Sequence, residues 1–251
     1  MTTQTSVNNL FSNSFLTVER SNTAGEVNTT ISNTDNTSSS SRAYLKLETG
    51  GASGGDPVMV NFNNVAYYTY GIDNTDSDAF VISANAALGT SNAARCSTAG
   101  EWTYPTQSAF NVNAGGTGGS KNVLNVTGNN TQYAPTLDNE RFDIGSDYDT
   151  GTSKYVAPVD GIYVFGANTT TFGGSNTQAF SRILVGGTIV FQGFVGHTAA
   201  SVGGNSNTGG VIELDAADEV TVALAVNGTG ADTMDYSGDT IVSWFSGALI
   251  A

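Results

Sequence analysis

Residue types that could perform covalent chemistry are sparse in this sequence. Cys96 is the only cysteine and His197 is the only histidine among the 251 residues. A cysteine–histidine pair needs the two side chains within hydrogen-bond reach, whereas these two fall in different predicted domains. A serine–histidine–aspartate triad would also have to use His197. We therefore expect a protein that is not an enzyme, with Cys96 as a small buried side chain and His197 in a loop.

Two acidic clusters could supply the hard oxygen ligands that Ca²⁺ prefers. One lies within residues 143–149, and the other consists of Asp232, Asp235 and Asp239. Neither has the spacing of an EF-hand loop. The second cluster is the candidate metal site, and calcium is the only cofactor that we consider. The alternative, which we favour, is that these are solvated loop carboxylates without a metal.

The elements that carry these residues are predicted to be strands. Charged residues make up 12% of the chain, about half of what is usual in a globular protein. The 12 Phe, 10 Tyr and 2 Trp fall in segments rich in Val and Ile, which favours packed strands over disorder. Clusters of Gly, Asn, Ser and Thr between these segments are typical of turns. The fold class is therefore predicted to be all-β.

Charge and hydropathy exclude two kinds of partner. With 22 acidic and 8 basic residues the net charge is −14, so binding to a phosphate backbone would have to overcome repulsion. No stretch approaches the length of a membrane span. The first residues, 1–13, have neither a basic region nor a continuous apolar run typical of a secretion signal. We expect synthesis in a cytoplasm, with no nucleic-acid partner and no membrane insertion.

The N-terminal region divides into a short first segment and a run of short strands. Residues 1–18 are the predicted attachment segment, whose apolar residues repeat at helical spacing; the alternative is a frayed terminus or a first strand. Residues 19–112 are the predicted β-rich domain. The strands expected there lie at residues 43–47, 58–62, 67–72 and 79–82.

Residues 15 to 105 contain a series of short motifs that resemble the shaft modules of bacteriophage tail fibres and other virion fibres. The motifs are Thr17-Val18-Glu19-Arg20, Ile31-Ser32-Asn33-Thr34, Gly54-Gly55-Asp56-Pro57, Gly71-Ile72-Asp73-Asn74 and Ala87-Leu88-Gly89. The resemblance implies an intertwined trimeric shaft, in which each strand finds partners on neighbouring chains. The alternative is an independent small β domain.

Residues 113–122 form a Gly-rich connection, and residues 123–251 after it are similar to the C1q family. The similar blocks are Lys154-Tyr155-Val156-Ala157-Pro158-Val159-Asp160-Gly161-Ile162-Tyr163-Val164-Phe165, Ile183-Leu184-Val185-Gly186-Gly187-Thr188, Gly209-Gly210-Val211-Ile212-Glu213-Leu214-Asp215-Ala216-Ala217-Asp218-Glu219-Val220 and Trp244-Phe245-Ser246-Gly247-Ala248-Leu249-Ile250. One departure is Ala217, where the family usually has Gly. The resemblance implies a C1q/tumour-necrosis-factor jelly-roll head.

The same resemblance implies a compact homotrimer with a buried C-terminal strand. Alternation along the strands independently predicts an apolar face on each of them. The residues expected to form the structural and trimer core are Tyr163, Phe165, Trp244 and Phe245.

Loops of a jelly roll cluster at the ends of its two sheets, where binding surfaces are usually built. Asparagines in the segment 203–210 and nearby aromatic rings could bind a sugar by hydrogen bonding and stacking. The candidate ligand-binding residues are Phe172, Phe180, Asn205, Asn207 and Tyr236. Core packing is the alternative for any single aromatic residue.

These expectations combine into one leading hypothesis about function. The chain is predicted to be a bacteriophage virion fibre protein on the particle exterior, attached to other virion proteins through its N-terminal region. Its C1q-like head would bind a host-surface glycan or protein. The first alternative is a head fibre or capsid decoration protein with a structural role, and the second is a cellular C1q-like lectin module.

Overall fold

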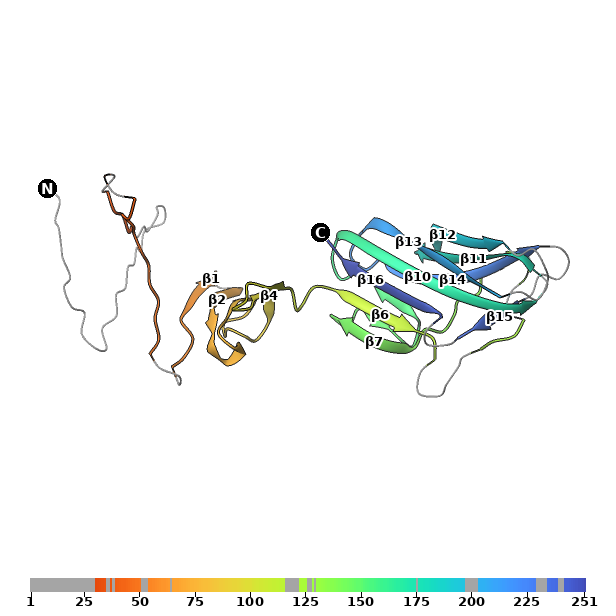
Figure 1. Cartoon of the computed structure of the whole chain (residues 1–251), viewed down its shortest axis with the longest axis horizontal. Helices are drawn as coiled ribbons and strands as arrows, with labels where there is room; N and C mark the ends of the chain where they lie inside the picture. The colour runs from red at the N-terminus through yellow and green to blue at the C-terminus, as the bar shows by residue number, and fades with distance from the viewer. Residues whose placement is uncertain are drawn as a thin grey trace. The chain divides into compact units, whose positions relative to one another are not determined.

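The computed structural model describes residues 30–34, 37, 39–50, 54–63, 65–115, 122–125, 128, 130–174, 176–196, 203–228, 234–238 and 242–251. The chain divides into two units, residues 1–50 and 51–251. The predicted attachment segment 1–18 lies outside the described residues. Within the described ranges every regular element is a strand except one short 3₁₀ turn, which confirms the all-β prediction (Figure 1). No helix there is long and apolar enough to cross a membrane.

A five-stranded antiparallel sheet begins at residue 58, and we call it the β1–β5 sheet. Its strands pair in sequence order and are β1 (Val58–Phe62), β2 (Tyr67–Asp73), β3 (Ala79–Ser83), β4 (Asn92–Cys96) and β5 (Trp102–Thr103). The turn η1 (Asn74–Asp76) joins β2 to β3. Asp73 caps this turn, because its Oδ1 accepts hydrogen bonds from Thr75 N at 3.0 Å and Asp76 N at 3.2 Å.

The strand expected at residues 43–47 is not present. Residues 41–50 are described without any strand, and the side chains of Tyr44, Leu45 and Leu47 are exposed. An extended segment becomes a strand only when a neighbouring strand accepts and donates its backbone hydrogen bonds. The described part of the chain places no such neighbour beside these residues, so the prediction from the local sequence pattern was wrong here.

The remaining strands form two facing sheets in a jelly-roll arrangement. The β10 sheet has the order β13-β10-β16-β6-β7, with β15 also paired to β10. The β11 sheet has the order β12-β11-β14-β9-β8. The bounds are β6 (Ala109–Asn113), β7 (Asn139–Ile144), β8 (Tyr148–Asp149), β9 (Lys154–Val156), β10 (Gly161–Gly174), β11 (Asn176–Val185), β12 (Thr188–Gly196), β13 (Gly204–Leu214), β14 (Glu219–Gly228), β15 (Met234–Ser237) and β16 (Trp244–Leu249).

Aromatic rings from both sheets fill the core between them. The Phe110 ring lies 4.8 Å from the Tyr155 ring and 4.9 Å from the Phe245 ring, centroid to centroid. Phe165 completes the group, 5.5 Å from Tyr155 and 5.8 Å from Phe245. The Tyr155 hydroxyl is hydrogen-bonded to Ser108 Oγ at 2.7 Å, which satisfies the one polar atom of this cluster. Burial raises the pKa of Tyr155 far above its usual range.

Because Gly247 has no side chain, two of these rings can occupy the space beside it. A Cβ at this position would lie 2.4 Å from Cδ1 of Phe165 and 2.8 Å from Cε1 of Phe110. Any side chain on Gly247 would therefore displace a core ring. The block Phe245-Ser246-Gly247 thus alternates a core ring, an outward hydroxyl and a space for neighbouring rings.

Strand β6 belongs to the β10 sheet, although it precedes the Gly-rich connection. In the pairing of β6 with β16, Val112 lies opposite Phe245. Gln107 Nε2 also donates to the Leu249 carbonyl at 2.6 Å, and Ala114 N donates to the Ser243 carbonyl at 3.0 Å. The connection expected at residues 113–122 therefore falls between two strands of the sheet rather than before the sheet.

The turn between β13 and β14 contains the residue that departs from the family pattern. Ala217 has φ 72°, in the left-handed region that favours glycine. The turn still forms, because Ala217 N donates to the Ala157 carbonyl at 2.7 Å and Ala216 N donates to Asp160 Oδ1 at 2.7 Å. The alanine therefore preserves the turn at the cost of local backbone strain.

Candidate functional site

The outward face of the β10 sheet carries a row of apolar side chains that crosses all five strands of its main path. Val164 lies opposite Val211 on one side and Ala248 on the other. Ala248 in turn lies opposite Ala109, and Ala109 lies opposite Ile144. We call these five residues the apolar row. Val211 is 57% exposed, and Val164 and Ile144 are each 36% exposed, so the row faces outward in the single chain.

The row beside it is also free of charge. It begins with Gly209 and Gly166 and continues through Ser246 and Asn111 to Phe142, which is 50% exposed. Antiparallel sheets that face water on one side usually carry polar residues there. Two adjacent uncharged rows with exposed Val, Ile and Phe side chains are instead typical of a protein–protein contact.

The four residues predicted to form the structural and trimer core divide between the two faces of the sheet. Tyr163, Phe165 and Phe245 are at most 3% exposed and point into the core between the sheets. Trp244 is only half-buried and lies on the outward face, where its ring contacts Gly166. Only Trp244 of these four is therefore positioned to contact a neighbouring chain.

Two of the candidate ligand-binding residues share one surface. Asn205 and Asn207 are two positions apart on β13, both are exposed, and both belong to the outward face of the β10 sheet. Asn205 Oδ1 accepts a hydrogen bond from Thr170 Oγ1 at 2.5 Å. This arrangement makes a polar end to the face that carries the apolar row, with amide groups available for hydrogen bonding.

The candidate aromatic residues do not join them at one site. Tyr236 is 1% exposed, and its ring lies 5.8 Å from the Tyr133 ring, so it has no free face for a sugar. Burial raises its pKa far above the usual range. Phe180 is half-buried on β11 of the other sheet, beneath the Arg182 guanidinium at 5.2 Å. Phe172 is half-buried on β10 and lies opposite Asp235.

The candidate calcium site is only partly described. Asp235 accepts a hydrogen bond from Asn125 N at 3.1 Å through Oδ1, while Asp232 and Asp239 lie outside the described residues. Across the described ranges, no three His, Cys, Asp or Glu side chains come close enough to hold a metal ion. His197 also lies outside these ranges, and Cys96 is half-buried on β4.

The family model described as the C1q domain matches residues 123–250, just over half of the chain. The chain belongs to the C1q domain family. The matched range begins after β6, so β6 is a strand of the β10 sheet that precedes the matched part of the C1q domain. No curated protein sequence matches the chain.

Several solved structures resemble part of the chain. The globular domain of zebrafish complement 1qA is 17% identical, with a TM-score of 0.41, over 58% of this chain and 98% of that one. The Eiger TNF structure from S. frugiperda is 14% identical, with a TM-score of 0.41, over 58% and 94%. Murine APRIL is 12% identical, with a TM-score of 0.42, over 57% and 99%.

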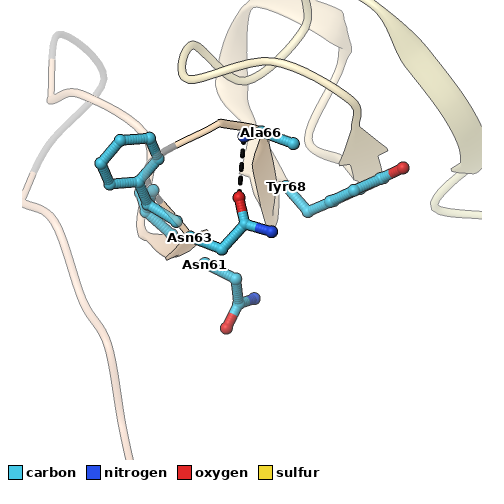
Figure 2. A pocket seen from close by; sticks show the side chains of 6 residues that line it. Asn61, Asn63, Ala66 and Tyr68 are labelled. Carbon is cyan, nitrogen blue, oxygen red and sulfur yellow. Dashed lines mark hydrogen bonds between the residues drawn. The ribbon is translucent and has the colours of Figure 1, made fainter.

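Outside the C1q domain, the hairpin of β1 and β2 borders an open hollow of about 430 Å³ (Figure 2). Asn63 lines it, but its Oδ1 already accepts hydrogen bonds from Ala66 N at 2.9 Å and Val65 N at 3.2 Å. Figure 2 shows Tyr68 directed away from Asn63, and Asn61 directed away from the hairpin turn. The polar groups therefore do not converge on one point, and the hollow has no geometry of a binding site.

Sequence reasoning missed the outward residues of the C1q domain's β10 sheet. The signal was present, because Tyr163-Val164-Phe165 and Gly210-Val211-Ile212 are apolar at consecutive positions rather than at alternate ones. Consecutive apolar residues in a strand indicate that both faces are covered. The row itself, however, depends on the registers of four strand pairs, and these are not visible in the sequence.

Proposed function

We propose that the chain forms a homotrimer in which the outward face of each β10 sheet packs against neighbouring copies. The single observation that carries this proposal is the apolar row, which is continuous across five strands and has no charged member. Each copy has a net charge of −14, so identical chains repel unless they meet at an uncharged surface. Burying the exposed Val211, Val164 and Ile144 side chains would offset that repulsion.

We further propose that this trimer is a virion fibre protein on the exterior of a bacteriophage, synthesised in the host cytoplasm. Support comes from the fibre-like motifs of residues 15–105 together with a C1q domain at the C-terminal end. The N-terminal region would attach to other virion proteins, and the C1q head would bind a host-surface glycan or protein. In this role the chain has no catalytic step.

Native mass spectrometry of the full chain tests the trimer. The wild type should have the mass of three chains, whereas Val211→Glu should shift the population toward single chains with unchanged circular dichroism. Val159→Glu is the matched control, because Val159 is 47% exposed but lies outside the apolar row. A monomeric wild type contradicts the proposal, and so does equal dissociation of the two variants.

Electron microscopy of phage particles labelled with an antibody against the C1q domain tests the role. Label at the tail supports host attachment, and label on the capsid supports the alternative of a head fibre or decoration protein. Purified particles without label would contradict both virion roles.

A further inference from the structure

The two faces of the β1–β5 sheet differ in burial. One face is covered over β2 and β3, and its buried side chains include Ala79 and Val81 as well as polar residues. Thr69, Asp73 and Ser83 lie on this face and are at most 4% exposed. The loop after β3 folds over them: Thr69 Oγ1 donates to the Asn85 carbonyl at 2.8 Å, and Gly89 N donates to Ser83 Oγ at 3.0 Å. The polar residues thus find their hydrogen-bond partners within the chain.

The opposite face, which we call the apolar face, is formed by two rows that cross the sheet. The first row runs from β1 to β4 and the second from β2 to β5, and their members are Met59, Tyr70, Ile82 and Ala94, then Ile72, Phe80, Cys96 and Trp102. The Phe80 and Trp102 rings make an edge contact with centroids 6.3 Å apart, as expected of side chains on one face. None of the eight is buried, and Trp102 is 52% exposed.

The apolar face is left open in the single chain. A sheet with one solvated face normally buries its apolar side chains and exposes its polar ones. A single sheet of this size also cannot bury enough apolar surface to be stable without a second layer. Among the described residues of the β1–β5 sheet, the buried apolar side chains are only Ala79 and Val81. The apolar face therefore needs a covering layer from outside the sheet.

We propose that the apolar face packs against the same face of two further copies of this chain, forming a threefold stem before the C1q head. This inference rests on the proposed homotrimer. Residues 104–108 are the only connection between β5 and β6, and five residues span at most about 18 Å. If the heads assemble, three β1–β5 sheets are held at high effective concentration next to one another.

The distribution of charge favours further copies of this chain as the partner that covers the apolar face. Neither row of the apolar face contains a charged residue, although the chain as a whole carries −14. The charged residues Asp73 and Arg95 belong to the opposite face, where Arg95 pairs with Asp76 at 2.5 and 2.9 Å. Three equally acidic chains can therefore meet at this face without bringing like charges together.

Cys96 lies on the apolar face. The alkylation rate of its thiol therefore measures how accessible this face is in the wild-type protein. The comparison thiol is that of the double variant Cys96→Ser/Val65→Cys. We expect maleimide to alkylate Cys96 of the wild type at least about tenfold more slowly than this thiol, because a packed face must open before its cysteine can react. Val65 is 89% exposed in the hairpin turn and does not belong to the apolar face. A short bifunctional maleimide should also link chains through Cys96 when the reaction is left to proceed.

Two charged variants separate packing between chains from burial within one chain. Met59→Lys, on the edge strand β1, and Ile82→Lys should each raise the alkylation rate of Cys96 about tenfold while the heads keep the protein trimeric. Val65→Lys is the matched control and should leave the rate unchanged. Because Met59 is 37% exposed in the single chain, its replacement should be tolerated even if Ile82→Lys does not fold.

The outcomes are distinct. A trimer whose Cys96 reacts as fast as the control thiol would overturn the stem and leave the homotrimer intact, and so would slow alkylation that Met59→Lys does not change. Fast alkylation of Cys96 in a trimer would mean that the apolar face contacts solvent or binds a different partner. A monomer in native mass spectrometry would instead contradict the proposed function on which the stem rests.

Discussion

Trp244 covers Gly166 on the outward face of the β10 sheet. Its ring atoms Cζ3 and Cη2 lie 3.4 and 3.5 Å from the place where a Cβ on Gly166 would be. The next residue, Phe245, points to the other side and is fully buried among the core rings. Two neighbouring aromatic residues of β16 therefore serve different surfaces, and they should respond differently to truncation.

Phe245→Ala should lower the stability of the C1q domain itself by about 3–5 kcal/mol, because it leaves a cavity among packed rings. Trp244→Ala should have a smaller effect on unfolding but should weaken the trimer. Chemical denaturation measures the first effect, and the concentration dependence of the native mass measures the second. Equal losses of fold stability with unchanged trimers would contradict the division between the two faces.

Ala217→Gly should stabilise the protein by about 1 kcal/mol, because glycine adopts the left-handed conformation without the clash that Cβ makes. Ala216→Gly is the matched control: Ala216 lies in the same turn without a positive φ, and glycine there should destabilise by up to about 1 kcal/mol. Urea midpoints of the two variants provide the measurement. A destabilised Ala217→Gly would show that the side chain makes contacts that outweigh its strain.

The ion pair of Asp76 and Arg95 should make the stability of the protein depend on pH in the acidic range. Hydrogen bonding to the Arg95 guanidinium lowers the pKa of Asp76 below its usual range. A lowered folded-state pKa contributes stability that is complete above the unfolded-state pKa and is lost as pH falls through the folded-state pKa. The melting temperatures of wild type and Asp76→Asn should therefore differ at pH 7 and converge in strong acid.

The Arg95→Gln background provides the control for this pair. There the Asp76→Asn change should lose most of its pH dependence, because the partner that lowers the pKa is gone. A difference between wild type and Asp76→Asn that persists unchanged at low pH would assign the effect to something other than the ionised pair.

Asn205→Ala together with Asn207→Ala should abolish or strongly weaken binding of the head to immobilised host-surface glycans, while the native mass stays that of the wild type. Both side chains are exposed on β13, so their removal should cost little fold stability. Phe180→Ala, on the other sheet, is the comparison. Loss of glycan binding in Phe180→Ala alone would move the ligand site to the β11 sheet.

Local pattern was sufficient for individual strands of this protein. The strand predicted at 58–62 is β1 with the same bounds, and the C-terminal block beginning at Trp244 is β16. The local pattern succeeds there because each strand has a partner that satisfies its backbone hydrogen bonds. Residues 43–47 have the same pattern and no partner in the described chain, and they form no strand.

The pairing between distant strands could not be predicted from the local sequence pattern. Ala109 and Ile144 join one row with Val211 only because four separate registers align, and a shift of one residue in any of them would turn that strand's side chains to the other face. The same limit explains why β6 was placed before the domain boundary. Its partner β16 lies more than a hundred residues later in the chain.

The pairing of β6 with β16 also determines when the head can fold during translation. Strand β6 leaves the ribosome well before its central partner, because residues 114–243 are synthesised between the two strands. At usual elongation rates β6 must wait roughly ten seconds or more for β16. Until then the strand edges of β10 and β6 that β16 will join are unpaired. These edges could pair wrongly with other nascent chains on the same messenger RNA. The head therefore completes its fold only after β16 has left the ribosome, and assembly of copies must follow that step.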